Sequence, residues 1–163
     1  MSQQPGDQFG NYRLVNPIGS GGFATVWLGQ HTTMGRSAAI KILSMQLPTH
    51  EERTHFLKEV RFLESLDHPN IVRVLDCGVQ NDIPFIILDY APNGTLRKRH
   101  PQGSRLAPDT IVTYVKQIAA GLQYAHDLRF IHRDVKPDSE RFCMPSCVVD
   151  QRVHGSLCRF AAG

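Results

Sequence analysis

The segment 130–139 carries the densest set of reactive side chains in the sequence, reading Phe-Ile-His-Arg-Asp-Val-Lys-Pro-Asp-Ser. An apolar pair leads into the charged run, and Pro137 follows it closely. The charged groups are therefore expected at the end of an ordered segment, held on a loop by rigid elements. This arrangement is typical of a catalytic loop.

A second candidate for chemistry is Lys41, the one charged residue in an apolar strand expected over residues 37–43. Burying an amine is costly unless an anion meets it, so a lysine in such a strand is a functional candidate. The alternative is an edge position from which the amine reaches water. The position of Lys41 soon after a glycine-rich hairpin favours the functional interpretation.

That hairpin covers residues 19–29, which read Gly-Ser-Gly-Gly-Phe-Ala-Thr-Val-Trp-Leu-Gly. Its glycines permit a tight turn with inward-facing backbone N–H groups, and the alternation of Ala24, Val26 and Leu28 predicts a returning strand. Such a hairpin can fold over phosphates, although an ordinary glycine-rich hairpin has the same pattern. A dinucleotide-binding site would need a helix directly after the glycines, and the β-branched and aromatic residues there favour a strand instead.

Two helices are expected to position these groups. The first covers residues 49–66, where Thr49 and Glu52 have the spacing of a capping box and Glu59 borders the apolar stripe. Glu59 is either a solvated flank of the helix or the partner of Lys41. The second helix covers residues 108–128 and supports the loop that follows it; its stripe consists of Ile111, Val115, Ile118, Leu122 and Ala125.

Two further strands are expected over residues 72–79 and 84–90, separated by a polar turn at 80–82. The second is continuously apolar up to Asp89, as a buried strand would be, and the run Pro-Asn-Gly at 92–94 then breaks it. Residues 1–11 are expected to form a flexible leader, and the apolar residues Tyr12, Leu14 and Ile18 favour a short strand within residues 9–18.

Composition excludes several classes of function. The chain has 163 residues, 41% of them hydrophobic, and a formal net charge of +3, which is too small and too dispersed for a nucleic-acid-binding face. It shows neither a signal sequence nor an apolar run long enough to span a bilayer, so a cytoplasmic location and no membrane segment in this chain are expected.

Taken together and in this order, these motifs resemble those of protein kinases over residues 12–138. The resemblance implies an α+β, protein-kinase-like fold, with a five-stranded antiparallel N-lobe sheet and one helix, plus a truncated, mainly helical C-lobe. The N-lobe and hinge would cover residues 12–91, and the partial C-lobe with the catalytic loop would cover residues 92–139.

The resemblance also implies roles for single residues. Asp134 would accept the proton of a protein hydroxyl, and Lys136, which is similar to the lysine of the serine/threonine branch, would neutralise the transferring phosphate. Glu59 would hold Lys41 against the α- and β-phosphates of ATP, Leu88 would line the back of the pocket, and the backbone of Asp89 and Ala91 would bind adenine. The remaining implied ATP-binding residues are Gly19, Ser20, Gly21, Gly22, Phe23, Ala24, Val26 and Ala39. The protein substrate is not indicated.

The sequence departs from the family pattern from Ser139 onward, where kinases have a magnesium-binding asparagine. No Asp-Phe-Gly follows, so most ligands for the expected Mg²⁺ are missing, and Asp150 lacks the motif of a metal aspartate. The tail 140–163 is not kinase-like. Its Cys143, Cys147, His154 and Cys158 match zinc spacing only in part, and a truncated or frame-shifted end explains the abrupt change better.

Three functions stay open on this reading. The chain is a serine/threonine protein kinase with impaired activity, a binding module that holds nucleotide or protein without catalysis, or a non-functional fragment whose helix at 108–128 exposes an apolar face.

Overall fold

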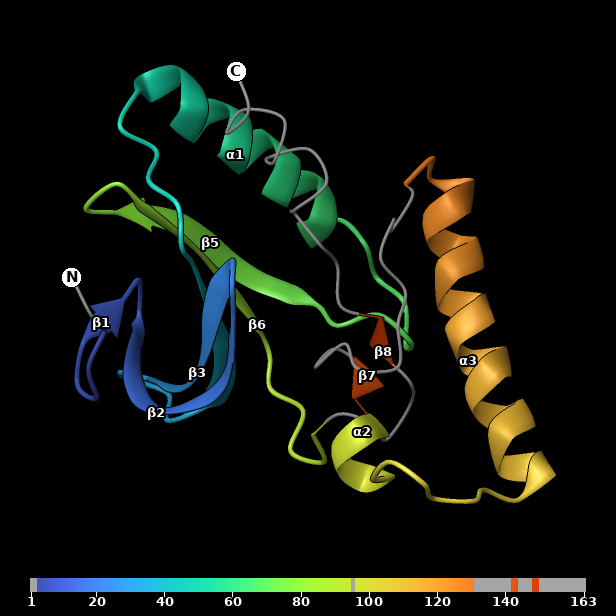
Figure 1. The fold of residues 1–163 in the computed structure, drawn as a ribbon. Coiled ribbons are helices and arrows are strands. Elements are labelled where there is room, and N and C mark those ends of the chain that lie inside the picture. Colours follow the sequence, from blue (N-terminus) through green and yellow to red (C-terminus); the bar gives the residue numbers. More distant parts are fainter. Residues whose placement is uncertain (1–2, 95, 131–141, 144–147, 150–163) are drawn as a thin grey trace. The chain divides into compact units, whose positions relative to one another are not determined.

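A computed structural model describes residues 3–94, 96–130, 142–143 and 148–149 (Figure 1). The chain divides into two compact units. The first consists of residues 1–65 and 73–90, and the second of residues 66–72 and 91–163.

The first unit is built on a six-stranded antiparallel sheet with the strand order β1-β2-β3-β4-β6-β5. Its strands are β1 (Gln8–Phe9), β2 (Tyr12–Gly21), β3 (Ala24–His31), β4 (Ser37–Leu43), β5 (Val74–Gln80) and β6 (Ile83–Asp89). Asn81 and Asp82 join β5 to β6 in left-handed backbone conformations, with φ of 51° and 65°. Such a two-residue turn matches the twist of the flanking strands.

Side chains alternate between the two faces of the sheet, and one face carries an apolar cluster. The cluster consists of Phe9, Tyr12, Leu14, Trp27, Ala38, Ile40, Ile42, Phe85 and Ile87. Because Ala38, Ile40 and Ile42 alternate along β4, its other residues, among them Ala39 and Lys41, belong to the opposite face.

The short strand β1 is the sixth strand of the sheet, one more than the five that the resemblance implies, and it lies within the segment 1–11 that was expected to be a flexible leader. Phe9 is only 6% exposed, and its ring meets Phe85 edge-on with centroids 5.4 Å apart. The side chain of Gln80 in β5 also donates to the carbonyl of Gln8 at 2.8 Å. Burial of one aromatic ring therefore ties this part of the leader to the sheet.

Helix α1 (His50–Glu64) connects β4 to β5 and packs against β5 and β6 (Figure 1). The predicted capping box is confirmed, because Thr49 Oγ1 accepts from Glu52 N at 3.2 Å and Glu52 Oε2 accepts from Thr49 N at 3.0 Å. The Thr49 hydroxyl, which donates to Oε2 of Glu52 at 2.7 Å, and then the backbone N–H of Thr49 lower the pKa of Glu52. The buried residues of α1, Phe56, Val60 and Leu63, lie outside the cluster on the first face, so α1 covers the second face of the sheet.

The described part of the second unit is mainly helical. It contains α2 (Leu96–Arg99), α3 (Pro108–Asp127) and the paired two-residue strands β7 (Phe142–Cys143) and β8 (Val148–Val149). The expected helix at 108–128 is confirmed, but its apolar stripe is covered only toward its end: Ala125 is 6% exposed, whereas Ile111 and Val115 are 47% and 58% exposed. None of the described helices is long and apolar enough to cross a membrane.

Candidate nucleotide-binding site

The register of the sheet brings four predicted ATP-binding residues to one face. Val26 of β3 lies opposite Lys41 of β4, and Ala39 of β4 lies opposite Leu88 of β6. Directly opposed residues of antiparallel strands project on the same side. The four residues therefore share the face opposite that apolar cluster, on three neighbouring strands; they are Val26, Ala39, Lys41 and Leu88.

Lys41 is the charged group among these four residues, and it is 4% exposed. Its neighbours across the strands are Val26 and Ile86, which offer no charge. An ammonium group taken out of water in this way costs several kcal/mol unless an anion meets it. The edge position considered from the sequence is wrong, because β4 is hydrogen-bonded to β3 on one side and to β6 on the other.

The glycine-rich hairpin is formed by β2 and β3, with Gly21 paired to Ala24 and the turn at Gly22 and Phe23. The strand predicted after the glycines is confirmed as β3, so the hairpin is not a strand-to-helix turn. A Cβ added at Gly22 would meet nothing within 4 Å. The turn therefore leaves its backbone open to the close approach of a bound group. Gly19 and Ser20 belong to β2, and Phe23 is 62% exposed.

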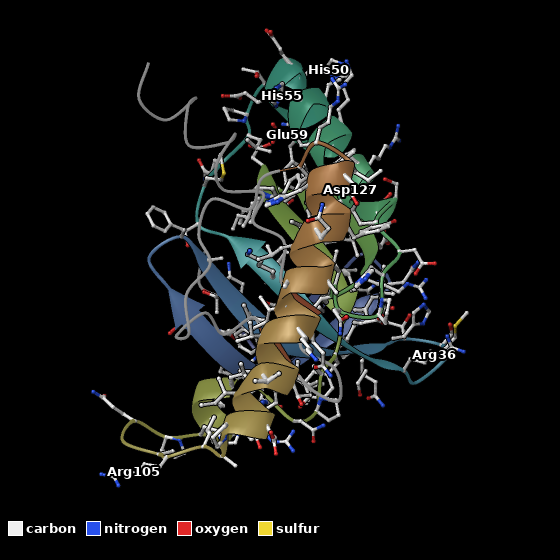
Figure 2. The ribbon with its side chains drawn as sticks, turned by 90° about the vertical axis from the view of Figure 1, so that its right-hand side faces the viewer. Arg36, His50, His55, Glu59, Arg105 and Asp127 are labelled. Atoms are coloured by element: carbon white, nitrogen blue, oxygen red, sulfur yellow. The ribbon has the colours of Figure 1, made fainter. Side chains whose placement is uncertain are left out.

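Glu59 lies on α1 between Phe56 and Val60, on the flank of the buried stripe, and its side chain is 24% exposed. Among the described residues, Glu59 has an ion-pair contact with His55, whose Nδ1 lies 3.7 Å from Oε1 of Glu59 (Figure 2). The pairing of Glu59 with Lys41 stays a prediction. His55 was not singled out from the sequence, although the i to i+4 spacing was available.

Arg53 fixes the beginning of α1 and was also missed. Its Nε donates to the carbonyl of Leu47 at 2.8 Å, and its Nη2 donates to the carbonyl of Pro48 at 3.0 Å. The same Nη2 pairs with Asp82 in the turn between β5 and β6. Arg53 therefore connects the loop before α1 to the sheet. It could not be singled out from the sequence, because its contact with Asp82 spans 29 positions and leaves no local pattern.

The predicted adenine-binding backbone lies at the end of the first unit and the start of the second. Asp89 donates its backbone N–H to the carbonyl of Arg73 at 3.0 Å, which fixes the end of β6. Ala91 accepts from the backbone N–H of Gly94 at 3.2 Å in the turn that follows. Contacts of Asp89 and Ala91 with adenine stay predictions.

In the second unit, the loop 66–72 is held on α3 by Tyr124. Its hydroxyl accepts from the backbone N–H of Asp67 at 3.3 Å, and its ring stacks on His68 with centroids 5.1 Å apart. Gly121 lets the loop approach the helix, because a Cβ there would lie 3.1 Å from the carbonyl oxygen of Asn70. Tyr124 is therefore a positioning residue for this loop.

Asp134 and Lys136, the predicted catalytic pair, lie outside the described residues, as do Ser139, Asp150, Cys147, His154 and Cys158. Cys143 belongs to β7, which pairs with β8. Within the described ranges, no three His, Cys, Asp or Glu side chains gather closely enough to hold a metal ion. The roles predicted for these residues stay predictions.

Comparison with known proteins places the whole set of motifs in one context. A family model described as "protein kinase domain" matches residues 12–139. The chain is 35% identical over 129 residues to the serine/threonine-protein kinase PrkC of Bacillus subtilis, and 35% identical over 130 residues to ATG1a of Arabidopsis thaliana, also a serine/threonine-protein kinase. Among solved structures, the PknI kinase domain of Mycobacterium tuberculosis superposes with a TM-score of 0.72 at 27% identity.

These matches cover most of this chain but only part of the other proteins. The alignments cover 78% of the chain with PrkC and 80% with ATG1a, and they span only 20% and 21% of those proteins. The superposition on PknI covers 93% of this chain and 62% of the PknI chain.

Proposed function

This chain belongs to the protein kinase family, and we propose that it is the ATP-binding part of a serine/threonine protein kinase, which transfers the γ-phosphoryl group of ATP to a protein hydroxyl. The observation that carries the proposal is the buried Lys41 on the face shared with Val26, Ala39 and Leu88. The similarity to serine/threonine kinases over about four fifths of the chain supports the choice of substrate class.

The shared face fits the chemistry of ATP in two ways. Ala39 and Leu88 offer an apolar surface of the kind that a nucleobase covers, and Lys41 offers a cation of the kind that phosphates meet. The hairpin of β2 and β3 borders Lys41 directly, since Val26 is its cross-strand neighbour. We infer that the hairpin covers the phosphates, that Lys41 neutralises them, and that Glu59 orients Lys41.

Bound ATP would supply the phosphoryl group. The remaining chemistry falls to the loop at 130–139, where Asp134 would accept the proton of the attacking hydroxyl and Lys136 would neutralise charge on the transferring group. The described residues offer no cluster that fits Mg²⁺, and Ser139 is a weaker ligand than an amide carbonyl.

A phosphotransfer assay tests the proposal. The chain is incubated with ATP labelled at the γ-phosphate and a mixed protein substrate, and incorporation into serine and threonine is measured. Asp134→Asn should abolish incorporation, whereas Asp109→Asn, on the first turn of α3, should leave it unchanged. Equal incorporation by the parent chain and Asp134→Asn would refute the assignment of Asp134.

A second candidate function is nucleotide binding without phosphoryl transfer. It is favoured by Ser139, which stands where the family has a metal-binding asparagine. This alternative expects ATP affinity that depends on Lys41 but changes little when Mg²⁺ is removed. Strong dependence of ATP affinity on Mg²⁺ would count against it.

A further inference from the structure

The positive charge of the chain is concentrated in one stretch of the second unit. Residues 91–130 contain six Lys and Arg but only two Asp and Glu, so this stretch alone carries a net charge of +4, compared with +3 for the whole chain. Four of the six cations fall within residues 97–105, and no Asp or Glu occurs between Asp89 and Asp109. We call residues 97–105 the basic turn, because nothing acidic lies near it in the chain to balance its charge.

The backbone of the basic turn is anchored on α3. His100 Nε2 lies 2.8 Å from the hydroxyl of Tyr114, on the second turn of α3, and the centroids of the two rings are 5.6 Å apart. The chain then reverses from Pro101 to Ser104, where the backbone N–H of Ser104 donates to the carbonyl of Pro101 at 3.0 Å. Gly103 supplies the left-handed conformation that such a turn needs, with a φ of 88°. The cations are therefore presented on a fixed segment.

Arg99 and Arg105 lie before and after this reversal, and both side chains are exposed. Figure 2 shows Arg105 on the connection between α2 and α3, with its side chain directed away from α3. A guanidinium group is always charged, and its planar set of donors matches the two oxygens of a carboxylate. Because the backbone beneath these side chains is already ordered, a bound anion would meet a smaller ordering cost.

We propose that the basic turn is a docking surface for an acidic segment of the protein substrate. This inference rests on the proposed function, since it names the chemistry of the second substrate. Charge complementarity favours Asp and Glu side chains as the groups that meet Arg99 and Arg105. A nucleic acid suits the surface less well, because its recognition needs a broad basic face rather than a few cations on one turn.

The basic turn acts on substrate binding rather than on the chemical step. It is separate in sequence from Lys41 and from the loop at 130–139, to which the proposed function gives the work on the phosphates. A contact that is equally strong before and during phosphoryl transfer lowers KM and leaves kcat unchanged. Because Arg99 and Arg105 are exposed, salt should weaken the attraction.

Fluorescence anisotropy on the 163-residue chain, without nucleotide, tests the proposal. The probe is a labelled peptide with one serine and a run of four glutamates, and the same peptide with four glutamines is the reference. The glutamate peptide should bind more tightly. Arg99→Gln combined with Arg105→Gln should weaken its binding by about 2- to 30-fold, the range of two exposed ion pairs. Arg36→Gln, which removes an exposed arginine from the first unit, is the matched control and should leave the affinity unchanged.

Several results would overturn the proposal. One is equal binding of the two peptides by the parent chain, and another is full affinity in the double variant. The single variants are measured as well, so that the comparison is read from variants that keep the melting midpoint of the parent. A DNA oligonucleotide of matched charge that displaces the glutamate peptide as well as unlabelled peptide does would reveal a general polyanion surface and overturn the choice of a protein segment.

The proposed function and this inference fail in different ways. Peptide binding is measured without phosphoryl transfer, so a chain that binds the glutamate peptide but transfers no phosphoryl group would refute the proposed function alone. A chain that phosphorylates the glutamate and glutamine peptides with the same KM would refute the docking surface alone.

Discussion

Gly78→Ala gives the sharpest test of how β5 and β6 pack. Gly78 lies opposite Phe85, and a Cβ at this position would lie 2.7 Å from Cζ and 2.9 Å from Cε1 of the ring. The ring has little room to move, because it is 5% exposed and meets Phe9 edge-on. An alanine at this position therefore has to displace a rigid ring that also holds β1 on the sheet.

The expected magnitude combines two opposing effects. Overpacking a core site typically costs about 1–3 kcal/mol. Replacing a strand glycine by alanine returns about 0.5–1 kcal/mol, because the unfolded chain loses freedom. Gly78→Ala should therefore lower the free energy of unfolding by about 1 kcal/mol at the middle of these ranges, and by up to about 2.5 kcal/mol at their limit. In the Phe85→Leu background the ring is gone, so the same change should be neutral or stabilising by about 0.5 kcal/mol.

Urea unfolding followed by the fluorescence of Trp27, the one tryptophan of the chain, measures these free energies. Trp27 is 5% exposed and belongs to the same apolar cluster as Phe85, so its emission reports on this core. Gly22→Ala, where a Cβ meets nothing within 4 Å, is the matched control and should change stability by less than about 0.5 kcal/mol. An equal cost of Gly78→Ala in both backgrounds would refute the packing argument.

Further predictions concern the N-terminus of α1 and the half-buried thiol of Cys77. Thr49→Ala should destabilise the chain by about 1 kcal/mol through loss of the N-cap, measured by urea unfolding. Because hydrogen bonds lower the pKa of Glu52, the ionised side chain stabilises the folded chain at neutral pH. This contribution to stability should be lost as pH falls through the lowered pKa. A titration of the Glu52 side chain by NMR that shows an ordinary pKa would contradict this. Burial, and then the charge of Glu64, raise the pKa of Cys77 to about 12. Cys77 should therefore be alkylated far more slowly in the native chain than in urea, as peptide mapping by mass spectrometry can show. The contribution of the neutral Cys77 thiol to folding stability should decrease as pH rises from the ordinary thiol range toward about 12.

Local patterns were enough to predict the main elements. The capping box located α1 within two residues, the continuous apolar run predicted β6, and the period of the long helix predicted α3. The placement of Lys41 in an apolar strand also followed from local sequence, because a lone charge among β-branched residues is visible without a structure.

Long-range packing was not predictable from those patterns. Strand β1 depends on the contact of Phe9 with Phe85, which are 76 positions apart, and Arg53 depends on a turn formed by a later strand pair. His55 is a different case, because its carboxylate partner is one turn away. It was missed because the histidine has no apolar or capping role that a pattern would single out.

The most direct test of the central claim is a thermal melt of the 163-residue chain with and without excess ATP and Mg²⁺. A ligand that binds only the folded state adds about 2.7 kcal/mol at one hundred times its dissociation constant. ATP should raise the midpoint of the parent chain and of Lys58→Met, which removes an exposed lysine from α1, but not that of Lys41→Met. A parent chain whose midpoint ignores ATP, or a Lys41→Met variant that responds as fully as the parent, would contradict the proposal that Lys41 holds the phosphates of ATP.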